Sequence, residues 1–322
     1  MHDTHISLAA RFTALRAQSL RLMAGLSEED CVVQSMPDAS PIKWHLAHTT
    51  WFFETFILAQ FAPSYRVFHE AFKVLFNSYY NAVGEKFPRP QRGLLTRPRL
   101  AEVLAYREYV DTAVHRLLTQ PHASEQTGAQ LAALVELGIQ HEQQHQELML
   151  TDLKHLLFCN PLMPAYQATA ASTSTGRVFD HVVQEGTSPP SWLECDGGLV
   201  AIGALPQHFS FDNEHPRHQV YVKPYALASH PVSNGQYLAF MQDGAYARPE
   251  LWLSEGWSSV QEWQWQAPFY WRQQDEDGRW QHFTLNGLEE LDLDAPVGHV
   301  SYFEADAFAR WSGAHLPTEA QW

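Results

Sequence analysis

The chain has 322 residues, of which 45% are hydrophobic and 18% charged, as in ordinary soluble globular proteins of about two domains. Acidic residues outnumber basic ones 36 to 21, and no basic stripe follows the chain, which argues against nucleic acid as a partner. No run of residues approaches membrane-spanning length, no signal-peptide pattern opens the chain, and the three cysteines are widely spaced. We therefore expect a cytoplasmic protein that is not inserted in a membrane.

Apolar residues at helical spacing predict four long helices in the first part of the chain. The first covers about residues 5–26, the second starts at Pro41 with Ser40 as its cap, and the others cover about 99–118 and 126–158. We therefore predict a four-helix bundle over residues 1–160.

The fourth predicted helix contains two histidines on one face. His141 and His145 are four residues apart, and Leu134, Gly138 and Leu148 continue the same stripe. Imidazoles in a core need partners for their nitrogens, and two that stand side by side can share a metal ion. One helix cannot complete such a site, so a third ligand must come from elsewhere.

The second predicted helix offers His45 and His48 as that third ligand. An inward stripe of Trp44, His48, Trp51, Thr55 and Leu58 slightly favours His48, but the residues alone leave the choice open. Three neutral imidazoles suit Fe(II), Zn(II), Co(II), Ni(II) or Cu(II) better than Mg or Ca. Such ligands must be unprotonated, so we expect metal affinity to fall below about pH 6.5.

Residues 141–145 also match the HExxH pattern of zinc peptidases, in which Glu142 would be the general base. The extended form of that pattern requires a glycine and a third histidine at positions that hold Leu148 and Thr151. We therefore prefer a bundle metal site with an upstream ligand to a peptidase.

A proline-containing segment separates the second and third predicted helices. Residues 87–95 cannot form an uninterrupted helix, so an ordered loop is expected, and its Arg89 and Arg92 are either solvated or able to clamp a carboxylate. Tyr79 and Tyr80 point in different directions on any regular element, so one can be buried while the other is a proton donor.

The character of the chain changes after residue 160. Residues 161–190 are expected to be a linker, and nine of the eleven tryptophans lie at or beyond Trp192. A strand is predicted at 218–222 and helices at 234–241 and 302–311, with clean amphipathic helices otherwise scarce. Residues 191–322 therefore predict an irregular, aromatic-rich α+β domain.

Eight ordered motifs stand out along the chain. Four lie in the first part: SPIKWHLAHTTWFFE at 40–54, FNSYY at 76–80, RPQRGLLTRP at 89–98 and HEQQHQE at 141–147. Together with the four in the second part, they resemble the sulfoxide synthases of ergothioneine biosynthesis, also called hercynine oxygenases. Four in the second part also resemble formylglycine-generating enzymes: FDNEHPRH at 211–218, HPVSNGQY at 230–237, PVGHVS at 296–301 and LPTEAQW at 316–322.

The resemblance implies an α+β multidomain protein: a DinB-like four-helix bundle followed by a formylglycine-generating-enzyme-like, C-type-lectin-like α+β domain. It implies a non-haem Fe(II) enzyme with O2 as co-substrate. Such an enzyme joins the sulfur of cysteine or γ-glutamylcysteine to the imidazole C2 of hercynine and oxidises the sulfur to a sulfoxide.

The resemblance also implies roles for individual residues. The iron ligands would be His48, His141 and His145, and Gln144 would hydrogen-bond the hercynine imidazole. Arg89 and Arg92 would hold the carboxylate of the thiol substrate. Tyr79 or Tyr80 would be the proton donor, with Tyr80 preferred.

The sequence departs from the family at its end. The chain stops at Trp322, within a motif that lies mid-domain in relatives, so we expect the second domain to be incomplete. The alternatives are a related enzyme that uses selenium or another thiol metabolite, and a non-catalytic metal-binding module.

Overall fold

The structure is a computed structural model that describes residues 7–121, 123–166, 191–274 and 278–322. The chain divides into two compact units, residues 1–167 and 168–322. Most of the linker predicted at 161–190 lies outside the described residues. In the part of the chain that the structure describes, no helix is both long and apolar enough to cross a membrane.

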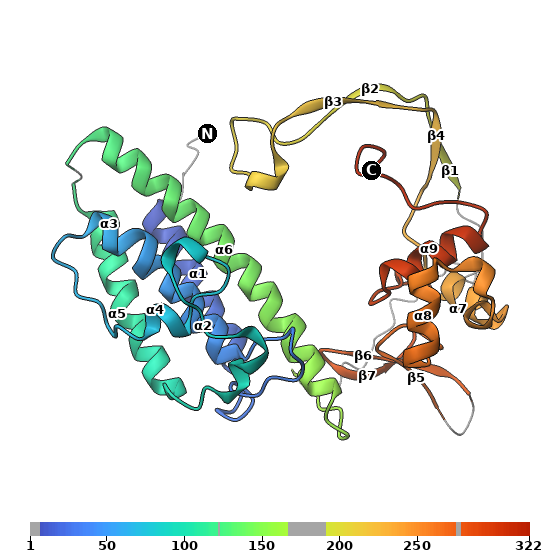
Figure 1. Cartoon of the computed structure of the whole chain (residues 1–322), viewed down its shortest axis with the longest axis horizontal. Coiled ribbons are helices and arrows are strands. Elements are labelled where there is room, and N and C mark those ends of the chain that lie inside the picture. The colour runs from blue at the N-terminus through green and yellow to red at the C-terminus, as the bar shows by residue number, and fades with distance from the viewer. Residues whose placement is uncertain (1–6, 122, 167–190, 275–277) are drawn as a thin grey trace, which may run out of the picture. The chain divides into compact units, whose positions relative to one another are not determined.

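Four long helices form the first unit (Figure 1): α1 (Leu8–Met23), α2 (Ile42–Phe52), α5 (Leu100–Thr119) and α6 (Glu125–Phe158). Helices α1 and α2 each pack against both α5 and α6, as the predicted four-helix bundle requires. The Ser7 and Ser124 side chains cap α1 and α6 by accepting hydrogen bonds from the backbone N–H groups of Ala10 and Thr127.

Helix α2 is buried on every side, which explains why periodicity gave little guidance about its inward face. Its start also differs from the prediction. Pro41 occupies the N-cap without a side-chain cap bond, and the Ser40 hydroxyl accepts from Arg92 instead. A π-helical turn, Phe53–Leu58, continues α2 and shifts its register, so Ile57 is buried whereas the predicted inward residue Thr55 is only half-buried.

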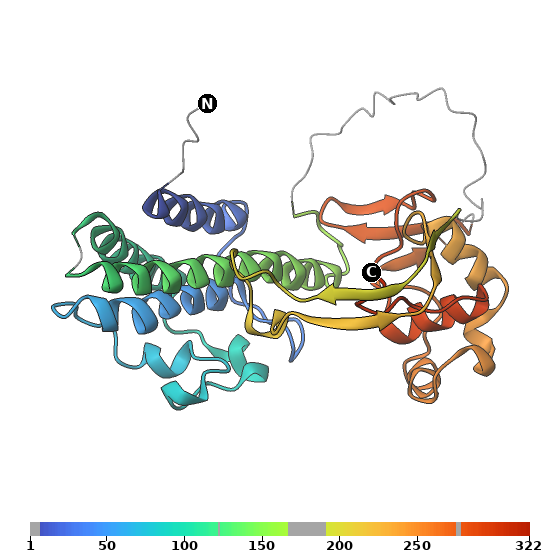
Figure 2. The ribbon, with the colours of Figure 1, turned by 90° about the horizontal axis from the view of Figure 1, so that it is seen from above.

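The segment that joins α3 (Ala59–Phe61) to α5 lies against the α2 side of the bundle (Figure 2). It contains α4 (Phe72–Leu75) and two 3-10 turns, Asn81–Val83 and Arg89–Leu94. The buried Lys43 ammonium ties it to α2 by donating to the carbonyls of Leu95 and Pro98, at 2.6 and 3.0 Å. This loop therefore has an ordered attachment beside the histidines of α2.

Over residues 191–274 and 278–322, the second unit has short antiparallel sheets and three α-helices. Strands β1 (Trp192–Cys195) and β4 (Tyr225–Ala228) pair, as do β2 (Gly198–Ile202) and β3 (His218–Val222). A three-stranded sheet follows in the order β5 (Trp271–Gln273), β6 (Trp280–Thr284) and β7 (Gly287–Glu290). The helices are α7 (Asn234–Gln242), α8 (Ser254–Trp263) and α9 (Tyr302–Trp311).

Helix α8 is absent from the sequence prediction, which named only two helices in this unit. Its fully buried residues are Gly256 and Val260, and Trp257 packs partly buried against the same core. A Cβ atom at Gly256 would lie 2.7 Å from the Cβ of Phe303 on α9, so glycine is what permits the two helices to approach. Tyr237, Phe240 and Trp271 are among the aromatic residues that form the core around these helices.

Candidate metal centre

Three histidines from two helices converge in the bundle. His48 lies on α2 and His141 and His145 lie on α6, and one ring nitrogen from each falls within 4.8 Å of those of the other two. The structure thus brings together the three residues predicted as metal ligands. The fourth candidate, His45, contacts the Nδ1 of His145 with its own Nδ1 and is not part of this convergent set.

A hydrogen bond to the backbone defines the tautomer of His48. Its Nδ1 lies 2.5 Å from the carbonyl oxygen of Phe76. A carbonyl oxygen only accepts, so Nδ1 carries the proton and the Nε2 lone pair of a neutral ring is available to a metal. The His48 ring is also stacked between Trp44 and Trp51, with ring centroids 4.5 and 5.4 Å away.

His141 has a buried nitrogen with no protein partner. Its Nδ1 makes no hydrogen bond, although buried polar atoms almost always have a partner. The ring lies 4.7 Å from the His145 ring and 4.8 Å from the Phe52 ring. The unsatisfied nitrogen and the imidazole donor set fit a divalent transition metal.

The histidines are held in the neutral form that metal binding requires. Burial lowers the pKa of His141 to about 4, and burial together with the neighbouring imidazoles lowers the pKa of His48 and of His145 well below the ordinary value. Burial also lowers the pKa of His45. We call these four side chains the imidazole cluster.

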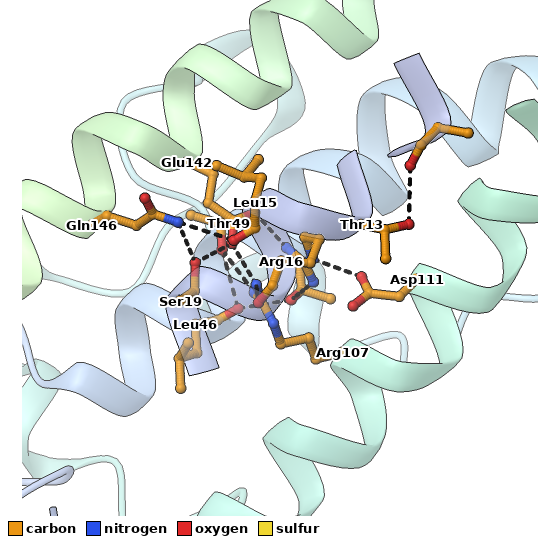
Figure 3. A network of polar contacts seen from close by, with 12 residues as sticks. Thr13, Leu15, Arg16, Ser19, Leu46, Thr49, Arg107, Asp111, Glu142 and Gln146 are labelled. Carbon is orange, nitrogen blue, oxygen red and sulfur yellow. Dashed lines mark hydrogen bonds and ion pairs between the residues drawn. The ribbon is translucent and has the colours of Figure 1, made fainter. Parts of the chain in front are cut away.

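Glu142, the residue after His141, belongs to a different group of contacts (Figure 3). Its carboxylate accepts from the Arg16 Nη1 at 2.7 Å, from the Ser19 hydroxyl at 2.5 Å and from the Arg107 guanidinium. Arg16 also donates to Asp111 at 2.7 Å. We call Arg16, Arg107, Asp111 and Glu142 the charged network.

The charged network removes the base that a zinc peptidase would need. Burial by itself would raise the pKa of Glu142, but the adjacent Arg107 and Arg16 lower this pKa to about 2. The carboxylate is 1% exposed and its oxygens are occupied by three donors. The match of residues 141–145 to the HExxH pattern therefore reflects a structural glutamate.

Arg92 lies beside the imidazole cluster. Its guanidinium carbon is 3.3 Å from the centre of the Trp44 ring, which stacks in turn on His48. The Ser40 and Ser78 hydroxyls accept from its Nη1 and Nη2, at 2.8 and 3.0 Å, and its buried Nε has no partner. Burial and the nearby Arg89 lower the pKa of Arg92 to about 10, so it remains a cation at neutral pH.

The two candidate tyrosines differ in environment. Tyr79 is 69% exposed, and its hydroxyl accepts from the Arg89 Nη1 at 2.7 Å. Tyr80 is half-buried against Trp51, Phe52 and Phe56, with ring centroids 5.5, 6.3 and 5.0 Å away. Because Phe52 also contacts His141, Phe52 connects Tyr80 to the imidazole cluster. Burial raises the pKa of Tyr80, so its hydroxyl keeps its proton.

Two further residues of the site escaped the sequence reasoning. Asp152 lies 3.0 Å from His45, and Phe76 contributes its carbonyl to His48. Asp152 stands seven residues after His145 on α6, two helical turns along the same face, which is a signal that a search for partners of the histidines could have used. Gln144, the predicted contact to the hercynine imidazole, is exposed, and its role stays a prediction.

Family models match both units. The DinB superfamily matches residues 11–149, and the sulfatase-modifying factor enzyme 1-like domain matches residues 178–322. The chain thus joins a DinB-like helical domain to a second domain of mixed helix and strand content, and the predicted fold class is confirmed.

Three similar proteins share one name. Hercynine oxygenase of Mycobacterium tuberculosis is 31% identical over 98% of this chain and 68% of its own length. That of Mycolicibacterium smegmatis is 36% identical over 58% of this chain and 40% of its own, and that of Mycolicibacterium thermoresistibile is 29% identical over 98% and 65%. The chain belongs to the hercynine oxygenase family, and its matches span 40% to 68% of the length of these relatives.

Proposed function

We propose that the chain is an Fe(II)- and O2-dependent sulfoxide synthase that joins the sulfur of cysteine or γ-glutamylcysteine to the imidazole C2 of hercynine. The reaction balances as thiol plus hercynine plus O2 giving the sulfoxide plus water. One S–H and one C–H bond are broken, one C–S and one S=O bond form, and O2 accepts the four electrons. Membership of the hercynine oxygenase family supports this activity. A cytoplasmic location is part of the proposal.

The observation that carries the proposal is the convergence of His48, His141 and His145 as neutral imidazoles. Three such ligands would hold Fe(II) and leave coordination positions open for substrates. Bound iron would supply the redox chemistry toward O2 that protein side chains lack. The iron itself, rather than another divalent metal, is proposed from the family name and the ligand types.

The loop beside α2 would bind and orient the thiol substrate. Arg92 is held by two hydroxyls and a tryptophan face, so its planar guanidinium is already positioned to pair with a carboxylate. Arg89 precedes it by one 3-10 turn and would add a second cation. This arrangement supports the use of an amino-acid thiol, whose carboxylate is an anion at neutral pH.

Tyr80 would be the proton donor of the reaction. Its ring packs on Phe52, which touches His141, whereas the Tyr79 hydroxyl is occupied by Arg89. A phenol with a raised pKa keeps its proton until a strong base develops nearby, which suits a donor to an oxygen-derived group.

Oxygen consumption by the iron-loaded chain tests the proposal. We expect O2 uptake that requires hercynine and a thiol together, and we expect Tyr80→Phe to lower kcat by about 100-fold with unchanged iron content. Tyr79→Phe is the matched control and should keep most of the activity. Iron binding without substrate-dependent O2 uptake would contradict the enzyme and support a metal-binding module. Equal loss in both tyrosine variants would remove the role assigned to Tyr80.

A further inference from the structure

Two hydrogen bonds link His145 to His45 and His45 to Asp152, on the side of the His145 ring that faces away from the convergent nitrogens. We call this series of contacts the relay. The Nδ1 of His145 lies 2.8 Å from the Nδ1 of His45, and the Nε2 of His45 lies 3.0 Å from Oδ2 of Asp152. The same carboxylate oxygen accepts from the Ser40 backbone N–H at 2.8 Å. The side chains of His45 and Asp152 are only 3% and 11% exposed, so water competes little for these bonds.

The Asp152 carboxylate determines which group donates and which accepts in each of these hydrogen bonds. Oδ2 of Asp152 already accepts from the Ser40 N–H and a carboxylate oxygen is an acceptor, so the His45 Nε2 donates to it. A neutral His45 then has a bare Nδ1, which can only accept, and the proton of the 2.8 Å contact must sit on the His145 Nδ1. His145 is thereby left with an unprotonated Nε2.

We propose that Asp152 and His45 are positioning residues that hold His145 in its Nδ1-protonated tautomer and so present its Nε2 to the metal. This inference rests on the proposed metal centre. It assigns to His45 a task different from ligation, although His45 is a histidine three residues from a ligand on the same helix.

The comparison with His48 shows why two residues are needed. The acceptor behind His48 is the Phe76 carbonyl, which can never donate, so the tautomer of His48 follows from one contact. The acceptor behind His145 is another imidazole, which can donate or accept at the same nitrogen. Only the carboxylate on its far side removes that ambiguity.

The relay also connects the two helices that carry the ligands. His45 lies on α2 one turn before His48, and Asp152 lies on α6 two turns after His145. A shift of α2 relative to α6 would therefore disturb the His145 ring as well as the ligand spacing. Partners of metal-bound histidines commonly tune affinity by about 10- to 100-fold.

The experiment compares variants at both positions in two ways. Asp152→Leu removes the acceptor, so His45 can carry its proton on Nδ1 and donate toward His145, which permits the opposite His145 tautomer as well. His45→Phe keeps a buried ring but removes the acceptor of His145. His45→Asn retains an amide oxygen near the Nδ1 position and should recover part of the effect. His115→Phe is the matched control, because His115 is exposed on α5 and is not part of the cluster.

The first readout is nuclear magnetic resonance of the metal-free protein with isotope-labelled histidine, which reports which nitrogen of His145 carries the proton. We expect Nδ1 in wild type and in His115→Phe, and a loss of that preference in Asp152→Leu. The second readout is anaerobic affinity for Fe(II), with Co(II) as a spectroscopic probe. We expect a 10- to 100-fold weaker Kd in Asp152→Leu and in His45→Phe.

The double variant separates positioning from general damage. If Asp152 acts through His45, then Asp152→Leu should have little further effect on Kd in the His45→Phe background. Additive losses, or an unchanged His145 tautomer in Asp152→Leu, would overturn the relay while leaving the metal centre intact. Failure of the wild type to bind either metal would instead overturn the proposed centre itself.

Discussion

His141 and Glu142 are neighbours in α6, yet they belong to buried polar groups of opposite kinds. The charged network gives the Glu142 carboxylate three donors, two of them from guanidinium groups. The imidazole cluster is uncharged, and it leaves the His141 Nδ1 without any protein partner. Both oxygens of the Glu142 carboxylate are satisfied within the protein, whereas the three convergent histidines have nitrogen lone pairs left for a ligand. The first group therefore stabilises the fold, and the second can bind a metal.

The largest expected effect is on stability, from breaking the charged network. Glu142→Ala leaves Arg16 and Arg107 buried beside each other without their shared carboxylate, which should cost about 3–5 kcal/mol in the free energy of unfolding. Denaturant unfolding of the metal-free chain measures the loss.

The outcome for Glu142→Ala would also test the separation of the two groups. Any fraction that remains folded should retain its metal ligands, since Glu142 is not one of them. A stable Glu142→Ala protein that has lost metal binding would mean that the glutamate belongs to the metal site after all.

The second-largest expected effect is a loss of metal affinity when a histidine of the imidazole cluster is replaced. His48→Phe keeps a planar ring in the stack between Trp44 and Trp51 but removes a ligand nitrogen. We expect the Kd for Fe(II) to weaken by more than about 100-fold, the upper end of what outer partners achieve. The free energy of unfolding should fall by only about 1 kcal/mol, for the donor that the Phe76 carbonyl loses.

Calorimetric titration with metal and denaturant unfolding of the same preparation give both quantities. If stability falls as much as in Glu142→Ala while Fe(II) still binds, His48 is structural and another residue completes the centre. His115→Phe, at an exposed position of α5, provides a control for the substitution itself.

The smallest effect is on the pH dependence of binding. The sequence predicts a loss of affinity below about pH 6.5, but burial lowers the pKa of His141 to about 4 and those of His48 and His145 in the same direction. Protons therefore compete with the metal only at lower pH, and affinity should change little between pH 7.5 and about 6 before falling toward pH 4.

The same shifts affect the stability of the metal-free chain. The unfolded chain binds protons on these histidines near their ordinary pKa of about 6.5, whereas the folded chain does not until lower pH, so stability should be full above that value and decline as pH falls toward 4. Unfolding experiments across this range measure the decline. A steep loss of Fe(II) affinity between pH 7 and 6 would show that the imidazoles are less buried than the structure has them.

Much of the first unit could be predicted from local patterns. Spacing of apolar residues indicated the four helices, and the i,i+4 pair of His141 and His145 indicated a shared metal, because both depend on the helical repeat alone.

In the second unit, the α9 helix was also predicted with its bounds at residues 302–311. By contrast, α8 was missed: only Gly256 and Val260 of its ten residues are fully buried, and a glycine gives no hydrophobic signal.

The choice between His45 and His48 was beyond such patterns. Both lie on a helix that is buried all round, so neither residue is distinguished by an apolar face. The resemblance to a family named His48, and the structure adds the physical reason. His48 points its ring toward the α6 histidines with its Nδ1 on a carbonyl, while His45 stands between His145 and Asp152.

The amino-acid sequence thus determined which helices form and which side chains are able to bind a metal, since both properties reside in short stretches of chain. Tertiary packing alone decided what each polar side chain does. Glu142 became structural because α1 and α5 supply arginines to it, and His45 became a partner of a ligand because α6 supplies Asp152. Those assignments depend on residues about 35 to 126 positions apart in the chain, which no local repeat can connect.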